Sequence, residues 1–221
     1  MFFKPKKSLG QNFLIDKDVL KNIVDTAEIY NKEVLEIGPG SGNLTEYILG
    51  KNPKKTYVVE KDNHLSILLQ EKFNNQIIII NDDVLKISEN DISNEKLTVF
   101  GNLPYNISTE ILSQWISNLN EKPWFEKLIL MFQKEVADRI IAKSNTSNYG
   151  RLSILSDWKL NIKKIQDIKP SSFSPRPKVD SSLLLFSPKK NFFKLNNCKN
   201  LEMITRVFFN QRRKMIKKPF N

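Results

Sequence analysis

Four consecutive residues, Asn102, Leu103, Pro104 and Tyr105, carry the clearest chemical potential in this chain. They place a carboxamide, a proline-fixed backbone carbonyl and an aromatic ring directly after the apolar run at residues 97–101. Such a tetrad can accept hydrogen bonds from a planar amino group while it stacks on the ring that carries that group. It therefore suits chemistry on a base or an amide nitrogen. The alternative is a plain strand-to-helix turn, in which Pro104 ends the strand and Tyr105 packs inward.

A second set of residues could hold a nucleoside. A glycine-rich loop, Gly38-Pro-Gly-Ser-Gly42, lies between an expected strand and an expected helix, where glycines let the backbone approach a ligand. Glu60 closes the next expected strand and could hold both hydroxyls of a ribose. Asp83 closes the third strand, within reach of the attached purine. This ordered series of strand ends predicts a cofactor that contains adenosine.

Two other classes of nucleotide site are less consistent with these residues. A nicotinamide dinucleotide site normally has a G-x-G-x-x-G loop, whereas this loop reads G-P-G-S-G-N. The chain also lacks the G-x-x-x-x-G-K-[ST] loop of nucleoside triphosphatases. S-adenosylmethionine, which has an adenosine and a charged amino-acid tail but no phosphates, fits better.

The elements that must position these residues alternate between strand and helix. Short β-branched runs separated by helical stretches predict a mostly parallel sheet covered on both faces, with ligands at the carboxyl ends of the strands. Residues 77–80 are so apolar that we expect them away from an open edge of the sheet. The expected strands are 34–37, 56–60, 77–80, 97–101 and 127–132, and the expected helices begin near residues 17, 44, 62, 107 and 133.

The pattern changes after residue 150. Two late strands, 160–168 and 183–186, flank the proline-rich segment 169–178 and predict an antiparallel edge with a long connection. A basic amphipathic helix is expected at 201–216. We therefore expect a catalytic domain at residues 1–188, followed by a linker and a basic helical segment at 189–221.

Composition and charge limit the classes of partner that this protein could bind. The 221 residues carry a net charge of +11, and the excess positive charge lies in the first ten residues and after residue 158. A polyanion such as nucleic acid is the expected partner, although solvated lysines of a lysine-rich proteome are an alternative. No apolar run is long enough to span a bilayer, and the N-terminus does not read as a secretory signal. The single cysteine excludes an intramolecular disulfide and a multi-cysteine zinc site, so a cytoplasmic protein is expected.

Seven motifs together resemble the ribosomal RNA adenine dimethyltransferases, and most closely the branch that acts on the bacterial small subunit. They cover nearly the whole chain in the expected order: Gly10-Gln-Asn-Phe-Leu14, Glu36-Ile-Gly-Pro-Gly40, Gly101-Asn-Leu-Pro-Tyr-Asn-Ile-Ser108, Gln133-Lys-Glu-Val136, Tyr149-Gly-Arg-Leu-Ser153, Phe173-Ser-Pro-Arg-Pro-Lys-Val-Asp-Ser181 and Phe209-Asn-Gln-Arg-Arg-Lys214.

The resemblance implies a Rossmann-like class I methyltransferase with a mostly parallel seven-stranded sheet, an antiparallel edge and a small C-terminal helical domain. It implies that family members dimethylate N6 of two adjacent adenosines in a hairpin near the 3′ end of 16S rRNA in the immature small subunit. Tyr105 and Phe173 would sandwich the flipped adenine. S-adenosylmethionine would be held by Asn12, Leu14, Gly38, Glu60, Asp83 and Asn102.

Several points stay open at this stage. We expect a monomer that needs no metal and no dedicated general base, with His64 outside the site. The family continues beyond the last motif with further helices, so we expect a shortened C-terminal domain here. The remaining alternatives are a 23S rRNA adenine methyltransferase and a ribosome-assembly factor whose RNA binding matters more than its catalysis.

Overall fold

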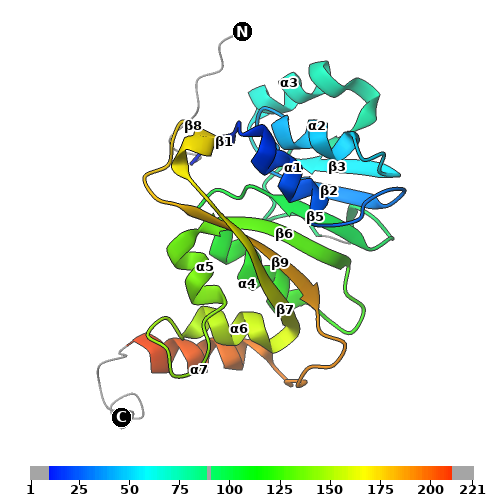
Figure 1. Ribbon diagram of the computed structural model, residues 1–221. Helices are drawn as coiled ribbons and strands as arrows, with labels where there is room; N and C mark the ends of the chain where they lie inside the picture. Colours follow the sequence, from blue (N-terminus) through cyan, green and yellow to red (C-terminus); the bar gives the residue numbers. More distant parts are fainter. Residues whose placement is uncertain (1–9, 89–90, 211–221) are drawn as a thin grey trace.

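A single seven-stranded sheet organises the protein, in the order β4-β3-β2-β5-β6-β9-β7 (Figure 1). The computed structural model describes residues 10–88 and 91–210. The first five strands of that order are parallel, and β9 is antiparallel to both β6 and β7. The predicted parallel sheet with an antiparallel edge is therefore confirmed. The strands are β2 (Glu33–Ile37), β3 (Lys55–Val59), β4 (Ile78–Ile80), β5 (Leu97–Gly101), β6 (Phe125–Gln133), β7 (Leu160–Ile168) and β9 (Ser181–Pro188).

Helices cover both faces of the sheet because successive strand side chains point to opposite sides. Val34 of β2 packs in the cluster beneath α1 and α2, whereas its neighbour Leu35 packs in the cluster beneath α4 and α5. Val58 of β3 meets α3 on the first of these faces. The helices are α1 (Lys17–Asp25), α2 (Asn43–Leu49), α3 (Asn63–Phe73), α4 (Ser108–Asn118), α5 (Lys134–Ile140), α6 (Arg151–Lys159) and α7 (Cys198–Asn210).

The segment before α1 is fixed by two contacts with a distant part of the chain. Strand β1 (Phe13–Leu14) pairs antiparallel with β8 (Phe173–Ser174) in a small second sheet. The Asp16 carboxylate caps α1 by accepting hydrogen bonds from the amides of Asp18 and Val19, and it also accepts one from the Ser172 hydroxyl at 2.8 Å. The helix start at Asp16 was predicted, but this pairing with residues 172–174 was not.

The expected interior position of the third strand was wrong. Strand β4 forms one edge of the sheet, and Ile78 is 46% exposed. Its neighbours explain the apolar sequence, because Ile77 packs under α3 and Ile80 packs against the cluster on the opposite face. An apolar strand sequence therefore indicates that both faces of the strand are covered by other elements. It does not indicate whether the strand has a neighbour on each side within the sheet.

The last part of the chain agrees with the prediction as far as the structure describes it. Helix α6 was not predicted, and the expected basic helix is observed as α7 up to residue 210. The basic residues of this end of the chain are also expected to contact RNA phosphates. They are Arg206, Arg212, Arg213, Lys214, Lys217 and Lys218, and all but Arg206 lie outside the described residues. Within the described residues, no helix combines the length and apolarity needed to cross a bilayer.

A buried lysine links α6 to the end of α4. Lys159 is 2% exposed, and its ammonium donates to the carbonyls of Ile116, Ser117 and Leu119 at 2.9, 3.3 and 2.7 Å. These carbonyls belong to the last turn of α4 and the residue after it, where helix carbonyls lack partners within the helix and a cation is favourable. Lys159 therefore gives a charged donor to three carbonyls at this helix end, of which that of Ile116 also accepts from the amide of Leu119.

We expect Lys159→Met to lower the free energy of unfolding by about 2–4 kcal/mol, because buried carbonyls lose a charged donor while the apolar volume is kept. Urea unfolding followed by circular dichroism would measure this change. The matched control is Lys163→Met on the exposed side of β7, which should change stability by less than about 0.5 kcal/mol. Equal effects of the two substitutions would show that Lys159 is not structural.

Candidate active site

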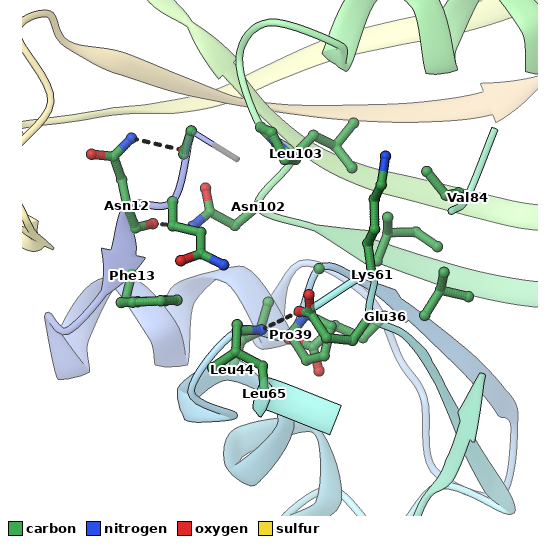
Figure 2. A pocket seen from close by; sticks show the side chains of 18 of the residues that line it. Asn12, Phe13, Glu36, Pro39, Leu44, Lys61, Leu65, Val84, Asn102 and Leu103 are labelled. Carbon is green, nitrogen blue, oxygen red and sulfur yellow. Dashed lines mark hydrogen bonds between the residues drawn. The ribbon is translucent and has the colours of Figure 1, made fainter. Parts of the chain in front are cut away.

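A cavity of about 200 Å³ opens at the carboxyl ends of β2, β3, β4 and β5, and it is lined by every predicted site residue except Phe173. This is the edge at which parallel α/β sheets bind their ligands. Figure 2 shows Asn12 and Asn102 on one side of the cavity and Lys61 and Val84 across from them. The predicted residues at the cavity are Asn12, Leu14, Gly38, Glu60, Asp83, Asn102, Leu103, Pro104 and Tyr105.

The glycine-rich loop forms one wall and packs closely against the N-terminal segment. Gly38 and Gly40 have φ values of 64° and 59°, in the left-handed region that favours glycine. A Cβ atom on Gly40 would lie 2.6 Å from the ring of Phe13. Glycine at position 40 therefore lets β1 close over the loop, which fixes one side of the cavity.

Glu60 directly follows β3, and both of its carboxylate oxygens accept hydrogen bonds from backbone amides. One oxygen accepts from the amide of Gly40 at 3.2 Å, and the other from the amide of Asp62 at 2.9 Å. The side chain is 6% exposed, and burial raises its pKa despite these two hydrogen bonds. Glu60 thus joins the glycine-rich loop to the start of α3 and presents a carboxylate to the cavity.

Asp83 also lines the cavity, and it is held by a lysine that was not singled out from the sequence. The Lys61 ammonium lies 2.7 Å from one Asp83 oxygen, and the amide of Leu85 donates to the other at 3.1 Å. The hydrogen bond from Lys61 holds the pKa of Asp83 below its usual range. Asp83 therefore stays ionised and remains an acceptor at the cavity wall.

Asn102 is oriented by the N-terminal segment. Its Nδ2 atom donates to the backbone carbonyl of Asn12 at 2.8 Å, which directs its Oδ1 atom away from this bond and leaves it free to accept (Figure 2). Asn43 holds the same segment from the other side, donating to the carbonyl of Leu14 at 2.7 Å. Asn43 could not be predicted from the sequence, because its partner is a backbone atom far away in the chain.

The rest of the tetrad provides a carbonyl and an anchored ring. The Pro104 carbonyl accepts from the amides of Ile107 and Ser108 at the start of α4, at 3.1 and 3.0 Å. Within the described residues, the Leu103 carbonyl has no such donor. The Tyr105 hydroxyl lies 2.6 Å from the hydroxyl of Ser181, and burial raises the pKa of Tyr105, which keeps the phenol neutral.

The structure places Phe173 away from the cavity. The ring is 1% exposed and packs in the core cluster with Leu14, Leu20 and Ile168. It is therefore a buried support behind β1 in this conformation, and its face is not open to a base. The pairing of β1 with β8 causes this burial, since Leu14 stands directly opposite Phe173.

A second carboxylate, Glu36, is buried beneath the cavity. It is 2% exposed and accepts a hydrogen bond from the Thr45 hydroxyl at 2.6 Å. Burial, with a further contribution from the charge of Glu60, raises the pKa of Glu36 to about 8. Burial thus makes Glu36 and Glu60 costly to ionise in the free protein. A positively charged ligand would lower this cost, so the two acids suit a cationic ligand.

This shift predicts how stability depends on pH. Because the pKa of Glu36 is raised from 4.5 to about 8 by folding, its contribution to stability is complete below about pH 4.5 and is lost as pH rises through 8. We expect thermal unfolding to show that Glu36→Gln reduces the loss of stability between about pH 6 and pH 9. Glu28→Gln, at an exposed carboxylate, is the control and should leave the wild-type pH profile unchanged. Identical profiles for wild type and Glu36→Gln would contradict the assignment.

Comparison with known proteins decides the family. The sequence model of the family described as ribosomal RNA adenine dimethylase matches residues 2–221. The chain belongs to this family. It is an rRNA methyltransferase that uses S-adenosylmethionine as its methyl donor. The acids that follow β3 and β4, the glycine-rich loop and the buried Glu36 line one cavity, and this set of acceptors fits a cationic cofactor.

Two curated relatives cover almost the whole chain. It is 74% identical over 221 residues to a protein named ribosomal RNA small subunit methyltransferase A from Pelagibacter ubique (strain HTCC1062), matching 100% of this chain and 84% of that protein. It is 44% identical over 219 residues to a protein of the same name from Wolbachia sp. subsp. Drosophila simulans (strain wRi), matching 97% of this chain and 79% of that protein.

Solved structures confirm the fold as that of class I S-adenosylmethionine-dependent methyltransferases. A dimethyladenosine transferase from Plasmodium falciparum aligns with a TM-score of 0.81 and 30% identity, over 94% of this chain and 74% of that chain. The 23S rRNA methyltransferase ErmE aligns with a TM-score of 0.72 and 25% identity, over 95% of this chain and 83% of that chain.

Proposed function

We propose that this enzyme dimethylates N6 of two adjacent adenosines near the 3′ end of 16S rRNA, in the immature small subunit. The names of the curated relatives support the small subunit as the target. The observation that supports this chemistry is the orientation of Asn102. Its amide nitrogen donates to the Asn12 carbonyl, so the Oδ1 atom of Asn102 is left to accept a hydrogen bond from the substrate. We propose that the protein acts in the cytoplasm as a monomer.

The cofactor is proposed to lie between the glycine-rich loop and the N-terminal segment. Glu60 would accept from the two ribose hydroxyls, and Asp83 would accept from the adenine amino group. Gly38, Asn12 and Leu14 would enclose it, together with Asn102. When bound, S-adenosylmethionine supplies an electrophilic methyl group on a positively charged sulfur.

The chain's own contribution to the reaction is to prepare the target nitrogen. The lone pair on adenine N6 is delocalised into the ring and is a poor nucleophile. Acceptors at Asn102 Oδ1 and the Leu103 carbonyl would hold the two N6 hydrogens and draw the nitrogen toward tetrahedral geometry. The Pro104 carbonyl does not fit this role, because two amides at the start of α4 already use it. Positioning and electrostatics then lower the barrier.

Tyr105 is proposed to stack on the flipped adenine. Its hydroxyl is anchored to Ser181, so the ring is held at the rim of the cavity. Stacking of a base on an aromatic ring contributes about 1–3 kcal/mol. The second face of the base would be left to other contacts, because Phe173 is buried behind β1.

We further propose that residues 1–188 form the catalytic unit and that residues 189–221 form a linker and a basic helical segment. Helix α7 is joined to the catalytic unit by a hydrogen bond of 2.6 Å from the Ser117 hydroxyl to Glu202. Tyr149 and Phe209 also meet edge to face, with ring centroids 6.1 Å apart. These contacts support a fixed position of α7 against the catalytic unit.

Labelled methyl transfer to separated ribosomal subunits tests the choice of substrate. We expect label in undermethylated small subunits and none in large subunits. Transfer to the large subunit alone would replace this proposal with a 23S rRNA methyltransferase, which the likeness to ErmE makes a reasonable second candidate. Binding to small subunits without transfer would favour an assembly factor.

A further inference from the structure

A lysine lines the cavity that holds the cationic cofactor. Among the described residues around this cavity, Lys61 is the only one with a basic side chain. A positive charge there repels a ligand that is itself positively charged, unless the ammonium is balanced by an acid and makes a useful contact of its own. Figure 2 shows the Lys61 side chain extended away from Glu36, on the side of the cavity where Val84 lies. The place of Lys61 in the site therefore calls for a chemical reason.

The backbone fixes Lys61 at the ends of two neighbouring strands. Lys61 follows Glu60, whose amide donates to the carbonyl of Ile80 at the end of β4, at 3.1 Å. The side chain of Asn81 donates to the Glu60 carbonyl at 2.7 Å. Because β3 and β4 are parallel neighbours, these bonds hold Lys61 close to the segment that leads to Asp83. Lys61 thus lies beside the acid that we propose for the ribose, where the attached base must also lie.

The ion pair of Lys61 with Asp83 places a donor directly beside an acceptor. The ammonium lies 2.7 Å from the Oδ2 atom of Asp83, and the amide of Leu85 donates to the Oδ1 atom at 3.1 Å. An ammonium has three N–H donors, and each carboxylate oxygen can accept two hydrogen bonds. The Lys61 side chain is 58% exposed, so its other donors can reach a ligand. The pair therefore offers one donor and one acceptor, side by side, to whatever occupies the cavity.

Adenine presents the complementary pattern, because its amino group is flanked by the ring nitrogens N1 and N7, which are acceptors. We propose that Lys61 is a specificity-determining residue, which donates to one of these ring nitrogens while Asp83 accepts from the amino group. Two contacts of opposite sense identify adenine better than one. A base with an oxygen in place of the amino group would turn an acceptor toward the Asp83 carboxylate. The proposal rests on the proposed function, because it takes Asp83 as the acceptor for the adenine of the cofactor.

Calorimetry of the free enzyme with altered bases tests this role. The ligands are S-adenosylhomocysteine and its two analogues in which N1 or N7 is replaced by C–H. We expect the wild type to bind one of the analogues about five- to tenfold more weakly than S-adenosylhomocysteine, because a hydrogen bond from a partly exposed charge is lost. Lys61→Met should bind that analogue and S-adenosylhomocysteine equally well. Any movement of Asp83 in this variant affects both ligands alike and cancels in the ratio. Lys61→Arg keeps a donor and should keep the preference.

A matched control breaks a similar ion pair that does not line the cavity. Lys169 lies 2.8 Å from Asp180, and Lys169→Met should keep the wild-type affinity and the wild-type preference. A preference that survives in Lys61→Met, or equal binding of all three ligands by the wild type, would overturn the role of Lys61. The analogue with an oxygen in place of the amino group tests Asp83 separately. If the wild type bound it as tightly as S-adenosylhomocysteine, the assignment of Asp83 in the proposed function would fail.

Discussion

We expect Asn102→Ala to reduce methyl transfer about a hundred- to a thousandfold, while binding of small subunits stays at the wild-type level. The substitution removes the acceptor that we propose for the reacting nitrogen, and loss of one such preorganised group typically has an effect of this size. Single-turnover transfer of labelled methyl groups measures the chemical step, and a filter-binding assay measures RNA affinity.

A matched substitution separates chemistry from folding. Asn161→Ala removes an exposed asparagine from β7 and should leave both measurements unchanged. Asn102→Asp keeps an acceptor oxygen but loses the donor to the Asn12 carbonyl, so it should retain more transfer than Asn102→Ala. Undiminished transfer by Asn102→Ala would refute the role of the amide.

The second large effect concerns the cofactor. We expect Glu60→Ala to weaken binding of S-adenosylmethionine about ten- to a hundredfold, because hydrogen bonds to a charged group contribute about 1.5–3 kcal/mol. Isothermal titration calorimetry of the free enzyme measures this directly. Since the carboxylate also binds the amides of Gly40 and Asp62, part of the loss will come from the glycine-rich loop.

Glu60→Gln distinguishes these two contributions. It keeps the size of the side chain and one acceptor oxygen, so it should lose less affinity than Glu60→Ala. Glu71→Gln, at an exposed carboxylate near the end of α3, is the control for loss of charge alone. Wild-type affinity in Glu60→Ala would mean that the ribose is held elsewhere.

Sequence patterns predicted most of the sheet because each strand carries its own local signal. The strand ends at Ile37, Glu60, Asp83 and Asn102 could be ordered along the edge of the sheet, since parallel strands bring their carboxyl ends together. The cavity does bring these positions together. The edge position of β4 could not be predicted from the sequence pattern, because apolar side chains indicate only that the two faces of a strand are buried.

Long-range pairings set the limits of the prediction. The burial of Phe173 follows from its pairing with Leu14, which lies far away in the sequence and gives no periodic pattern. The ion pair of Lys61 with Asp83 and the hydrogen bond of Asn43 to Leu14 are likewise contacts of individual atoms.

The most direct test of the central claim is the chemical identity and position of the product. Undermethylated small subunits would be incubated with the enzyme and S-adenosylmethionine, and the rRNA would then be digested and analysed by mass spectrometry. We predict N6,N6-dimethyladenosine at two adjacent positions near the 3′ end of 16S rRNA, and nowhere else in that RNA. A methylated base other than adenine, or dimethyladenosine only in 23S rRNA, would contradict the account.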